Sequence, residues 1–339
     1  MRKRQSPKRK ASKKKEQAPK PTVEILPIEY ETQAIEETAN VLFKPNKGPQ
    51  TDFLAAAERE VLYGGSAGGG KSYAMLADPL RYMGHPAFSG LLLRHTTEEL
   101  RELVFKSQEL YPKIWPGIKW SERKMQWTAP SGARLWMSYL DRDDDVLRYQ
   151  GLAFSWIGFD ELTQWSTPYA WNYMRSRLRS TAPDLPIYMR ATTNPGGRGH
   201  HWVKKTFIDP APYNRAFDAT DTDTGEVLRY PAGHEKAGRS LFKRRFIPAR
   251  LSDNPYLAES GDYEAMLLSM PEQQRRQLLE GDWDIKEGAA FTEFDRNIHV
   301  IEPFDIPNNW VKFRACDYGY GSKSGVVWFA VAPNEQLVV

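Results

Sequence analysis

One glycine-rich segment limits what this chain can fold into more than any other feature of its sequence. The segment reads Gly65-Ser66-Ala67-Gly68-Gly69-Gly70-Lys71-Ser72 and matches the phosphate-binding pattern G-x-x-x-x-G-K-[ST]. Glycines allow positive φ angles, so backbone N–H groups can converge on phosphate oxygens. The pattern predicts that Lys71 binds the β- and γ-phosphates of a nucleotide and that Ser72 holds Mg²⁺. We expect a strand over Glu60–Tyr63 before the segment and a helix over Lys71–Met83 after it, as the motif requires.

Two adjacent acids follow a second buried strand, which we expect over Ser155–Phe159. In a phosphate-loop protein an acid at this position holds the metal, so we assign that role to Asp160. The next residue, Glu161, has the chemistry of a general base that activates water. Switch-type GTPases orient water with Gln instead. The Asp-Glu pair therefore favours an ATP-hydrolysing motor.

Polar residues elsewhere qualify as accessory groups. A strand expected over Ile187–Thr192 leads into Thr193 and Asn194, which places these two residues at the carboxyl edge of a parallel sheet, where ligands bind. They either sense the γ-phosphate or form an ordinary turn. Gln50, upstream of the loop, either reads the adenine edge or is a surface residue.

Catalysis of this kind also uses a cation at the leaving phosphate. Arg148 and Arg94 are the candidates, and Arg142 is less favoured; each is equally consistent with a solvated arginine.

Strands alternate with helices from about Glu60 to Val203, which predicts an α/β fold with a mostly parallel sheet and helices on both faces. Residues Asp209–Arg239 are rich in Pro, Gly and Asp and predict a long loop or hairpin. A new strand pattern starts at Phe313. The remaining elements that we expect are helices over Thr32–Val41, Thr51–Arg59, Glu98–Tyr111 and Asp262–Leu279, and strands over Leu91–Arg94, Met125–Trp127 and Arg134–Tyr139.

The net charge of +4 hides an uneven distribution, because residues 1–20 carry +9 and the rest of the chain −5. The basic tail suits a polyanion such as nucleic acid, or is a solvated leader. An acidic body predicts that any DNA contact is a local patch or needs the oligomer. Lys204/Lys205 and Lys243–Arg245 are the candidate patches, and they are equally consistent with plain solvated surface. A single cysteine, Cys316, excludes an intramolecular disulfide. No apolar run approaches the ~20 residues of a membrane-spanning helix, so we expect no membrane partner.

Taken together, these motifs resemble the large terminase subunit, the DNA-packaging ATPase and nuclease of tailed bacteriophages. The resemblance rests on the glycine-rich segment and on four further blocks: Pro49–Phe53; Arg148–Gly151 leading to Phe159–Thr163; Thr192–Gly196; and Phe246–Ala249 through Asp253–Pro255 to Leu279–Trp283. The last block has no chemical logic that we can derive from its residues, yet it is the most specific to the family.

The resemblance implies a disordered basic tail (1–24), a P-loop ATPase domain of the additional-strand, catalytic-glutamate type (25–245), a linker subdomain (246–290) and the start of an RNase H-like nuclease domain (291–339). It implies that Thr192–Asn194 couple hydrolysis to movement and that Arg148 is offered to a neighbouring subunit. It also places Asp317 at the first metal-binding position of the nuclease, where its own pattern favours a turn or cap residue. Many relatives carry an Arg within the phosphate loop, where this chain has Ser66 and Ala67.

The implied function is an ATP- and Mg²⁺-dependent motor that translocates double-stranded DNA into a procapsid. Its expected partners are DNA, the portal protein, the small terminase subunit and further copies of itself in a ring, in the host cytoplasm at the portal vertex. The chain ends at Val339, so we expect no competent Mg²⁺- or Mn²⁺-dependent nuclease from it alone. Two alternatives stay open: a helicase or repair ATPase, and a nucleotide-binding assembly adaptor without turnover.

Overall fold

The computed structural model describes residues 43–285, 301, 304–319, 324–334 and 336–339. The basic tail and the helix expected over Thr32–Val41 lie outside the described residues. The chain divides into a first unit that ends at Glu287 and a second that begins at Gly288. Among the described residues, no helix has the length and apolarity needed to cross a membrane.

A nine-stranded sheet organises the first unit, in the order β3-β4-β5-β2-β6-β7-β1-β9-β8. The six central strands of this sheet (β5, β2, β6, β7, β1 and β9) are parallel to one another. Antiparallel strands complete both edges. The predicted mostly parallel sheet is confirmed. The strand bounds are β1 Glu60–Gly65, β2 Ser89–Arg94, β3 Lys119–Ser121, β4 Gln126–Thr128, β5 Arg134–Tyr139, β6 Trp156–Asp160, β7 Tyr188–Thr193, β8 Ala216–Asp218 and β9 Lys243–Ala249.

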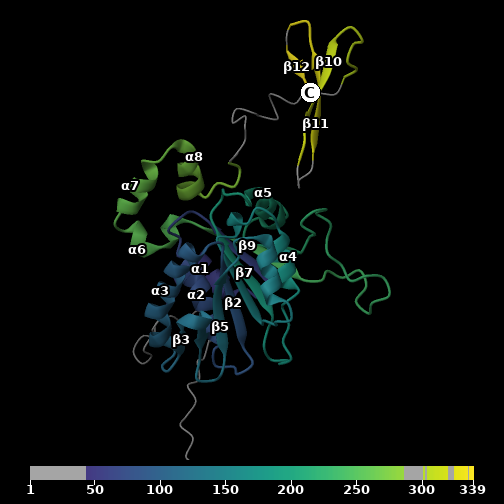
Figure 1. Cartoon of the computed structure of the whole chain (residues 1–339). Coiled ribbons are helices and arrows are strands. Elements are labelled where there is room, and N and C mark those ends of the chain that lie inside the picture. Colours follow the sequence, from purple (N-terminus) through teal and green to yellow (C-terminus); the bar gives the residue numbers. More distant parts are fainter. Residues whose placement is uncertain (1–42, 286–300, 302–303, 320–323, 335) are drawn as a thin grey trace, which may run out of the picture. The chain divides into compact units, whose positions relative to one another are not determined.

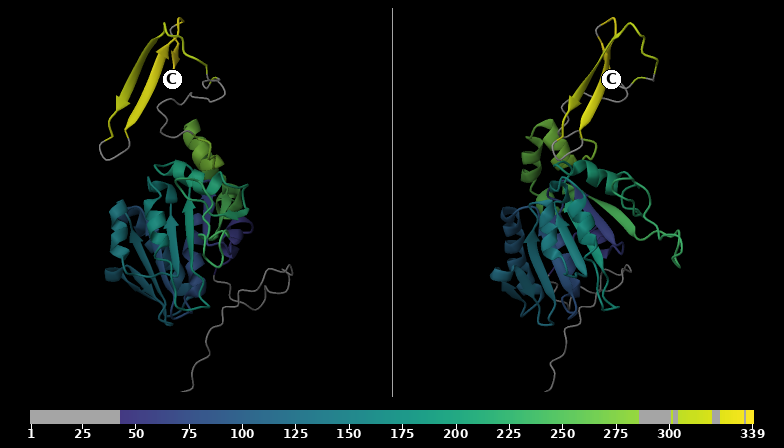
Figure 2. Two further views of the ribbon diagram at one scale, coloured as in Figure 1. Left: turned by 90° about the vertical axis from the view of Figure 1, so that its right-hand side faces the viewer. Right: turned by 45° about the vertical axis from the view of Figure 1, so that its right-hand side comes forward.

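Helices cover both faces of this sheet, as predicted (Figures 1 and 2). On one face Phe53, Met75 and Leu103, from α1, α2 and α3, pack in one buried cluster with β1 residue Val61. On the other face Trp171 of α4 packs with Phe159 of β6 in a second cluster. The helices of these layers are α1 Pro49–Ala55, α2 Lys71–Ala77, α3 Thr97–Ile114, α4 Tyr169–Arg175 and α5 His200–Val203; short 3₁₀ or π turns are η1 Asp78–Tyr82, η2 Glu122–Lys124, η3 Asp143–Tyr149, η4 Leu162–Gln164 and η5 Lys204–Ile208.

Two helices end earlier than the sequence predicts. The first stops at Ala55, because Ala56 turns to an extended conformation and its carbonyl oxygen accepts a hydrogen bond from Arg190. The second gives way after Ala77 to a 3₁₀ turn that contains Pro79, whose ring disfavours a continued α-helix.

The single helix expected over Asp262–Leu279 is wrong. The chain there forms α7 (Asp262–Leu268), α8 (Glu272–Arg275) and the π turn η7 (Arg276–Glu280). Pro271 sits between them with a ψ of 147°, an extended value that breaks the helix. Together with η6 (Leu251–Asp253) and α6 (Pro255–Ala258), these turns and helices are called the linker helices below.

Strand β9 was not predicted from the sequence, although its residues Arg244 to Ala249 pair in parallel with β1. Its residue Arg244 is fully buried and forms a 2.7 Å ion pair with Glu60. Lys243 pairs with Asp218 at 2.6 Å. The prediction that Lys243–Arg245 form a DNA-binding patch is therefore wrong for Arg244, because its guanidinium is buried against Glu60 and is not exposed to DNA.

The second unit contains an antiparallel sheet of β10 (Val311–Asp317), β11 (Gly325–Val331) and β12 (Leu337–Val338) in that order. Phe313 and Phe329 stack across the first pair, with ring centroids 4.9 Å apart. The strand expected from Phe313 is confirmed, and Asp317 is its last residue.

Candidate functional site

The predicted residues meet because three neighbouring parallel strands end at one edge of the sheet. β1 runs into the glycine-rich segment, β6 ends at Asp160, and β7 ends at Thr193. Strand β7 lies between β1 and β6 and pairs with both. The phosphate loop, the two acids and the Thr192–Asn194 group are therefore adjacent, as sequence reasoning expected.

Lys71 is buried at the centre of this site. Its ammonium donates hydrogen bonds to the side-chain oxygen of Asn194 at 2.8 Å and to the carbonyl oxygen of Ser66 at 2.5 Å. Burial lowers the pKa of Lys71, and the nearby carboxylates of Glu161 and Asp160 oppose that shift. A buried cation beside two acids is suited to bind an anionic phosphate chain together with a metal.

Glu161 has a strained backbone, with a φ of 59° in the left-handed region. Such strain in a residue with a side chain clusters at functional sites. The backbone N–H of Asn194 donates to Glu161 Oε2 at 3.2 Å. Burial, with the neighbouring charge of Asp160, raises the pKa of Glu161. A carboxyl with a raised pKa is a better proton acceptor at neutral pH, as a general base requires.

Asp160 is buried between a cation and a hydroxyl. Arg94, the last residue of β2, places its Nε 3.3 Å from Asp160 Oδ2, while Thr192 donates to Oδ1. Neither Asp160 Oδ2 nor Arg94 Nη1 has a hydrogen-bond partner among the described residues. These orphaned buried atoms fit a site that is completed by a metal ion and a phosphate. Arg94, of the two leading arginine candidates, is the one that lies at the acids.

Mg²⁺ would here be held by Asp160, by the hydroxyl of Ser72 and by phosphate oxygens. The described residues contain no group of three or more His, Cys, Asp or Glu side chains able to hold a metal alone. That donor set suits an ion that arrives with its nucleotide, because Mg²⁺ prefers few protein ligands, water and substrate phosphates. The ion would neutralise charge on the phosphates.

The Thr193 hydroxyl lies 2.7 Å from that of Thr163, in the turn after Glu161. Gln50 is buried, and both ends of its amide are engaged: Nε2 donates to Gly70 O at 2.9 Å and Oε1 accepts from Asn46 N at 2.6 Å.

Arg148 does not contact the loop or the acids. It donates to Tyr139 O at 2.9 Å, pairs with Asp145 at 3.3 Å, and is 47% exposed. That exposure leaves it accessible to another molecule. Asp317 is an exposed residue of the second unit.

The linker helices contact the phosphate loop directly, which sequence reasoning did not anticipate. The N–H of Ala67 donates to Leu278 O, in η7, at 2.7 Å, while the N–H of Ser66 donates to Ala249 O, at the end of β9, at 2.8 Å. The side chain of Asn254 donates to Gly68 O at 2.7 Å. Asn254 belongs to the last of the blocks that carry the resemblance. The family specificity of that block was the only sequence signal that pointed to Asn254.

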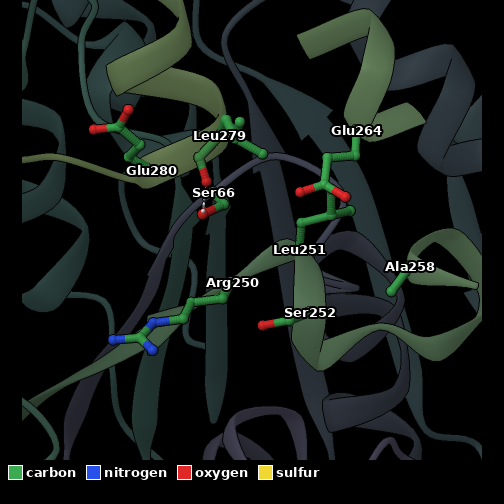
Figure 3. A pocket seen from close by; sticks show the side chains of 8 residues that line it. All are labelled: Ser66, Arg250, Leu251, Ser252, Ala258, Glu264, Leu279 and Glu280. Atoms are coloured by element: carbon green, nitrogen blue, oxygen red, sulfur yellow. Dashed lines mark hydrogen bonds between the residues drawn. The ribbon is translucent and has the colours of Figure 1, made fainter. Parts of the chain in front are cut away.

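A cavity of about 270 Å³ lies between the loop and the linker helices (Figure 3). Ser66 faces it from the loop, with its hydroxyl bonded to Leu279 O at 2.7 Å. Arg250 and Glu264 line it from the linker side. The phosphate loop is thus enclosed by the sheet on one side and by the linker on the other.

The family model described as terminase large subunit, T4likevirus-type, N-terminal, matches residues 62–298, which include the loop, the acids and the linker helices. The chain belongs to this terminase family. No curated protein matches the sequence.

Solved terminases resemble this chain in fold. The large terminase of a thermophilic bacteriophage, in complex with ADP, superposes with a TM-score of 0.52 and 17% identity, over 86% of this chain and 66% of that one. The large terminase ATPase domain of Thermus phage P74-26 gives a TM-score of 0.45 and 14% identity, over 71% and 94%. The terminase chain described here thus spans slightly less than two thirds of the first of these proteins.

Proposed function

We propose that this chain hydrolyses ATP to translocate double-stranded DNA into a procapsid, as the motor subunit of a terminase. The observation that carries the proposal is that Lys71 and Glu161 both hydrogen-bond to Asn194, while Asp160 hydrogen-bonds to the nearby Thr192, in a member of the terminase family. Lys71 and Ser72 bind phosphate and Mg²⁺, Asp160 holds the metal, and Glu161 accepts a proton from the attacking water.

Coupling and assembly complete the proposal. Thr192–Asn194 bridge the loop lysine and the acids, so a change at the γ-phosphate reaches β7. Arg94 stabilises charge within its own chain, and the exposed Arg148 is offered to a neighbouring subunit of a ring on the portal. DNA and the small terminase subunit are the other partners, in the host cytoplasm. Gripping of DNA is mostly electrostatic and sequence-independent.

The second unit is proposed to begin an RNase H-like nuclease, with Asp317 as a metal ligand. Support comes from its position at the end of β10, the first strand of an antiparallel sheet. The residues 246–290 are proposed as the linker subdomain, although β9 continues the sheet as far as Ala249.

The test compares ATP turnover and packaging by the wild type with those of Glu161→Gln. We expect kcat to fall about 10²–10⁴-fold, as for a lost general base, while ATP binding persists. Glu102→Gln, which alters a 66% exposed acid on α3, is the matched control and should behave as wild type. Protection of DNA from added nuclease by portal-bearing capsids should require ATP and an intact Glu161.

Other results would replace this proposal. Unwinding of a forked duplex without capsid-dependent protection would indicate a helicase. Binding of ATP without turnover in the wild type would indicate an assembly adaptor.

A further inference from the structure

Three consecutive carbonyl groups of the glycine-rich loop are each held by a side chain. Tyr63, in β1, donates to Gly69 O at 2.7 Å. Asn254, at the start of α6, donates to Gly68 O at 2.7 Å, and Gln50, in α1, donates to Gly70 O at 2.9 Å.

Holding a carbonyl also orients the N–H group of the following residue. A trans peptide is planar, and its C=O and N–H bonds point in opposite directions. The three contacts therefore set the directions of the N–H groups of Gly69, Gly70 and Lys71. None of these three N–H groups donates to an acceptor among the described residues. Earlier in the loop, by contrast, the N–H groups of Ser66 and Ala67 are taken up by Ala249 O and Leu278 O.

The holding groups are themselves fixed. Asn46 N donates to Gln50 Oε1 at 2.6 Å, and Asn46 Nδ2 lies 3.5 Å from Asn254 Oδ1, which links two of the three. Tyr63 is fully buried and stacks on Phe53 at 5.3 Å. Burial and the charges of Asp253 and Asp52 raise the pKa of Tyr63, so its hydroxyl stays protonated and donates.

We infer that Tyr63, Asn254 and Gln50 are positioning residues, which orient the Gly69, Gly70 and Lys71 N–H groups toward phosphate before a nucleotide arrives. The inference rests on the proposed nucleotide-binding function of the loop and extends it. Preorganised donors need no rearrangement when the anion binds, so they increase affinity for the phosphate chain itself. This role for Gln50 differs from reading adenine, because its amide is engaged with backbone groups at both ends.

The test uses a ligand that has phosphates and no base. Binding of Mg²⁺-tripolyphosphate and of Mg²⁺-ADP to the full chain is measured by calorimetry, together with the unfolding midpoint. We expect Tyr63→Phe and Asn254→Asp each to weaken both ligands by the same factor, about 3–10-fold, as for the loss of one hydrogen bond. Gln50→Glu should act likewise, whereas an adenine reader would weaken ADP alone.

The matched control is Tyr111→Phe. Tyr111 is also fully buried and donates its hydroxyl to a backbone carbonyl, that of Leu76, at 2.9 Å. This variant should lower the unfolding midpoint and leave both affinities unchanged. If Tyr63→Phe and Asn254→Asp bound tripolyphosphate as tightly as the wild type does, the inference on positioning would be overturned, while the proposed nucleotide site would stand. Absence of binding by the wild type would overturn the proposed nucleotide site as well.

Discussion

The side-chain oxygen of Asn194 accepts a 2.8 Å hydrogen bond from the ammonium of Lys71. The same residue donates its backbone N–H to Glu161 at 3.2 Å, with its side-chain nitrogen 3.5 Å from the other carboxylate oxygen. Asn194, directly after β7, thus joins the lysine that is proposed to bind phosphate to the acid that is proposed to activate water. If a γ-phosphate displaced Lys71 from Asn194, the contacts between Asn194 and Glu161 would therefore change as well.

Replacement of Asn194 should separate catalysis from binding. We expect Asn194→Ala to lower kcat about 10- to 100-fold, with a smaller change in ADP affinity, because it removes the side-chain link between Lys71 and Glu161 although the backbone N–H that donates to Glu161 remains. Steady-state ATPase assays and ADP titrations measure the two effects. Equal loss of both would mean that Asn194 serves binding rather than coupling.

The two arginines should differ in where they act. Arg94→Ala removes a cation 3.3 Å from Asp160, so we expect about a 10²-fold loss of turnover in the isolated chain. Arg148→Ala alters an exposed side chain and should reduce only the turnover that is stimulated by capsids and DNA. A loss of basal turnover in Arg148→Ala would place its action within one chain.

Gly281 should be sensitive to a single added methyl group. Its φ is +66°, and a Cβ would come within 2.7 Å of Ser66 N in the phosphate loop. Gly261→Ala is the control, since its φ is +69° and nothing lies within 4 Å of its added Cβ. Both substitutions should cost about 1–2 kcal/mol of stability from backbone strain. Only Gly281→Ala should also weaken ADP binding in a titration.

Glu60 should contribute stability that depends on pH. Burial alone would raise the pKa of Glu60, but Arg244 and Arg175 outweigh it and hold the pKa below the ordinary value of 4.5. Its contribution is therefore present above pH 4.5 and is lost as the pH falls through the lowered value. We expect Glu60→Gln to cost about 3–5 kcal/mol at pH 7, since Arg244 stays buried and unpaired. The difference from wild type in chemical unfolding should shrink below pH 4.5.

Glu102→Gln serves as the comparison for that experiment. Glu102 pairs with Lys106 at 2.6 Å on the surface of α3, so its loss should cost at most about 0.5 kcal/mol. A Glu60 variant as mild as this one would show that the buried pair adds little to stability.

The sequence predicted the parts of the site whose residues are close together in the chain. The glycine-rich loop, the Asp160–Glu161 pair and the Thr192–Asn194 group each follow an apolar strand, and parallel strands end at one edge. Arg94 could be named but not ranked, because its approach to Asp160 depends on β2 and β6 being neighbours.

Contacts between segments that are distant in the chain could not be predicted from the sequence. Strand β9 has charged residues at its start and a proline within it, so its pattern does not resemble a buried central strand. The charge of buried Arg244 is compensated by Glu60, which lies opposite it on β1, 184 residues earlier in the chain. The role of Asn254 could be recognised only from the structure, in which its side chain donates to the carbonyl of Gly68 in the loop. The break at Pro271 could have been read from the sequence, since proline interrupts helices.

Strand β1 leads into the loop, yet both of its partners in the sheet come much later in the chain. Its pairing with β7 and β9 requires residues up to Ala249, and the last side chain that holds a loop carbonyl is Asn254. A ribosome that makes this protein therefore releases the glycine-rich segment long before the residues that shape it. A nascent chain that stops before β9 carries the complete motif but leaves one edge of β1 open. The proposed nucleotide site is thus complete only after synthesis has passed Asn254, when most of the first unit has already emerged.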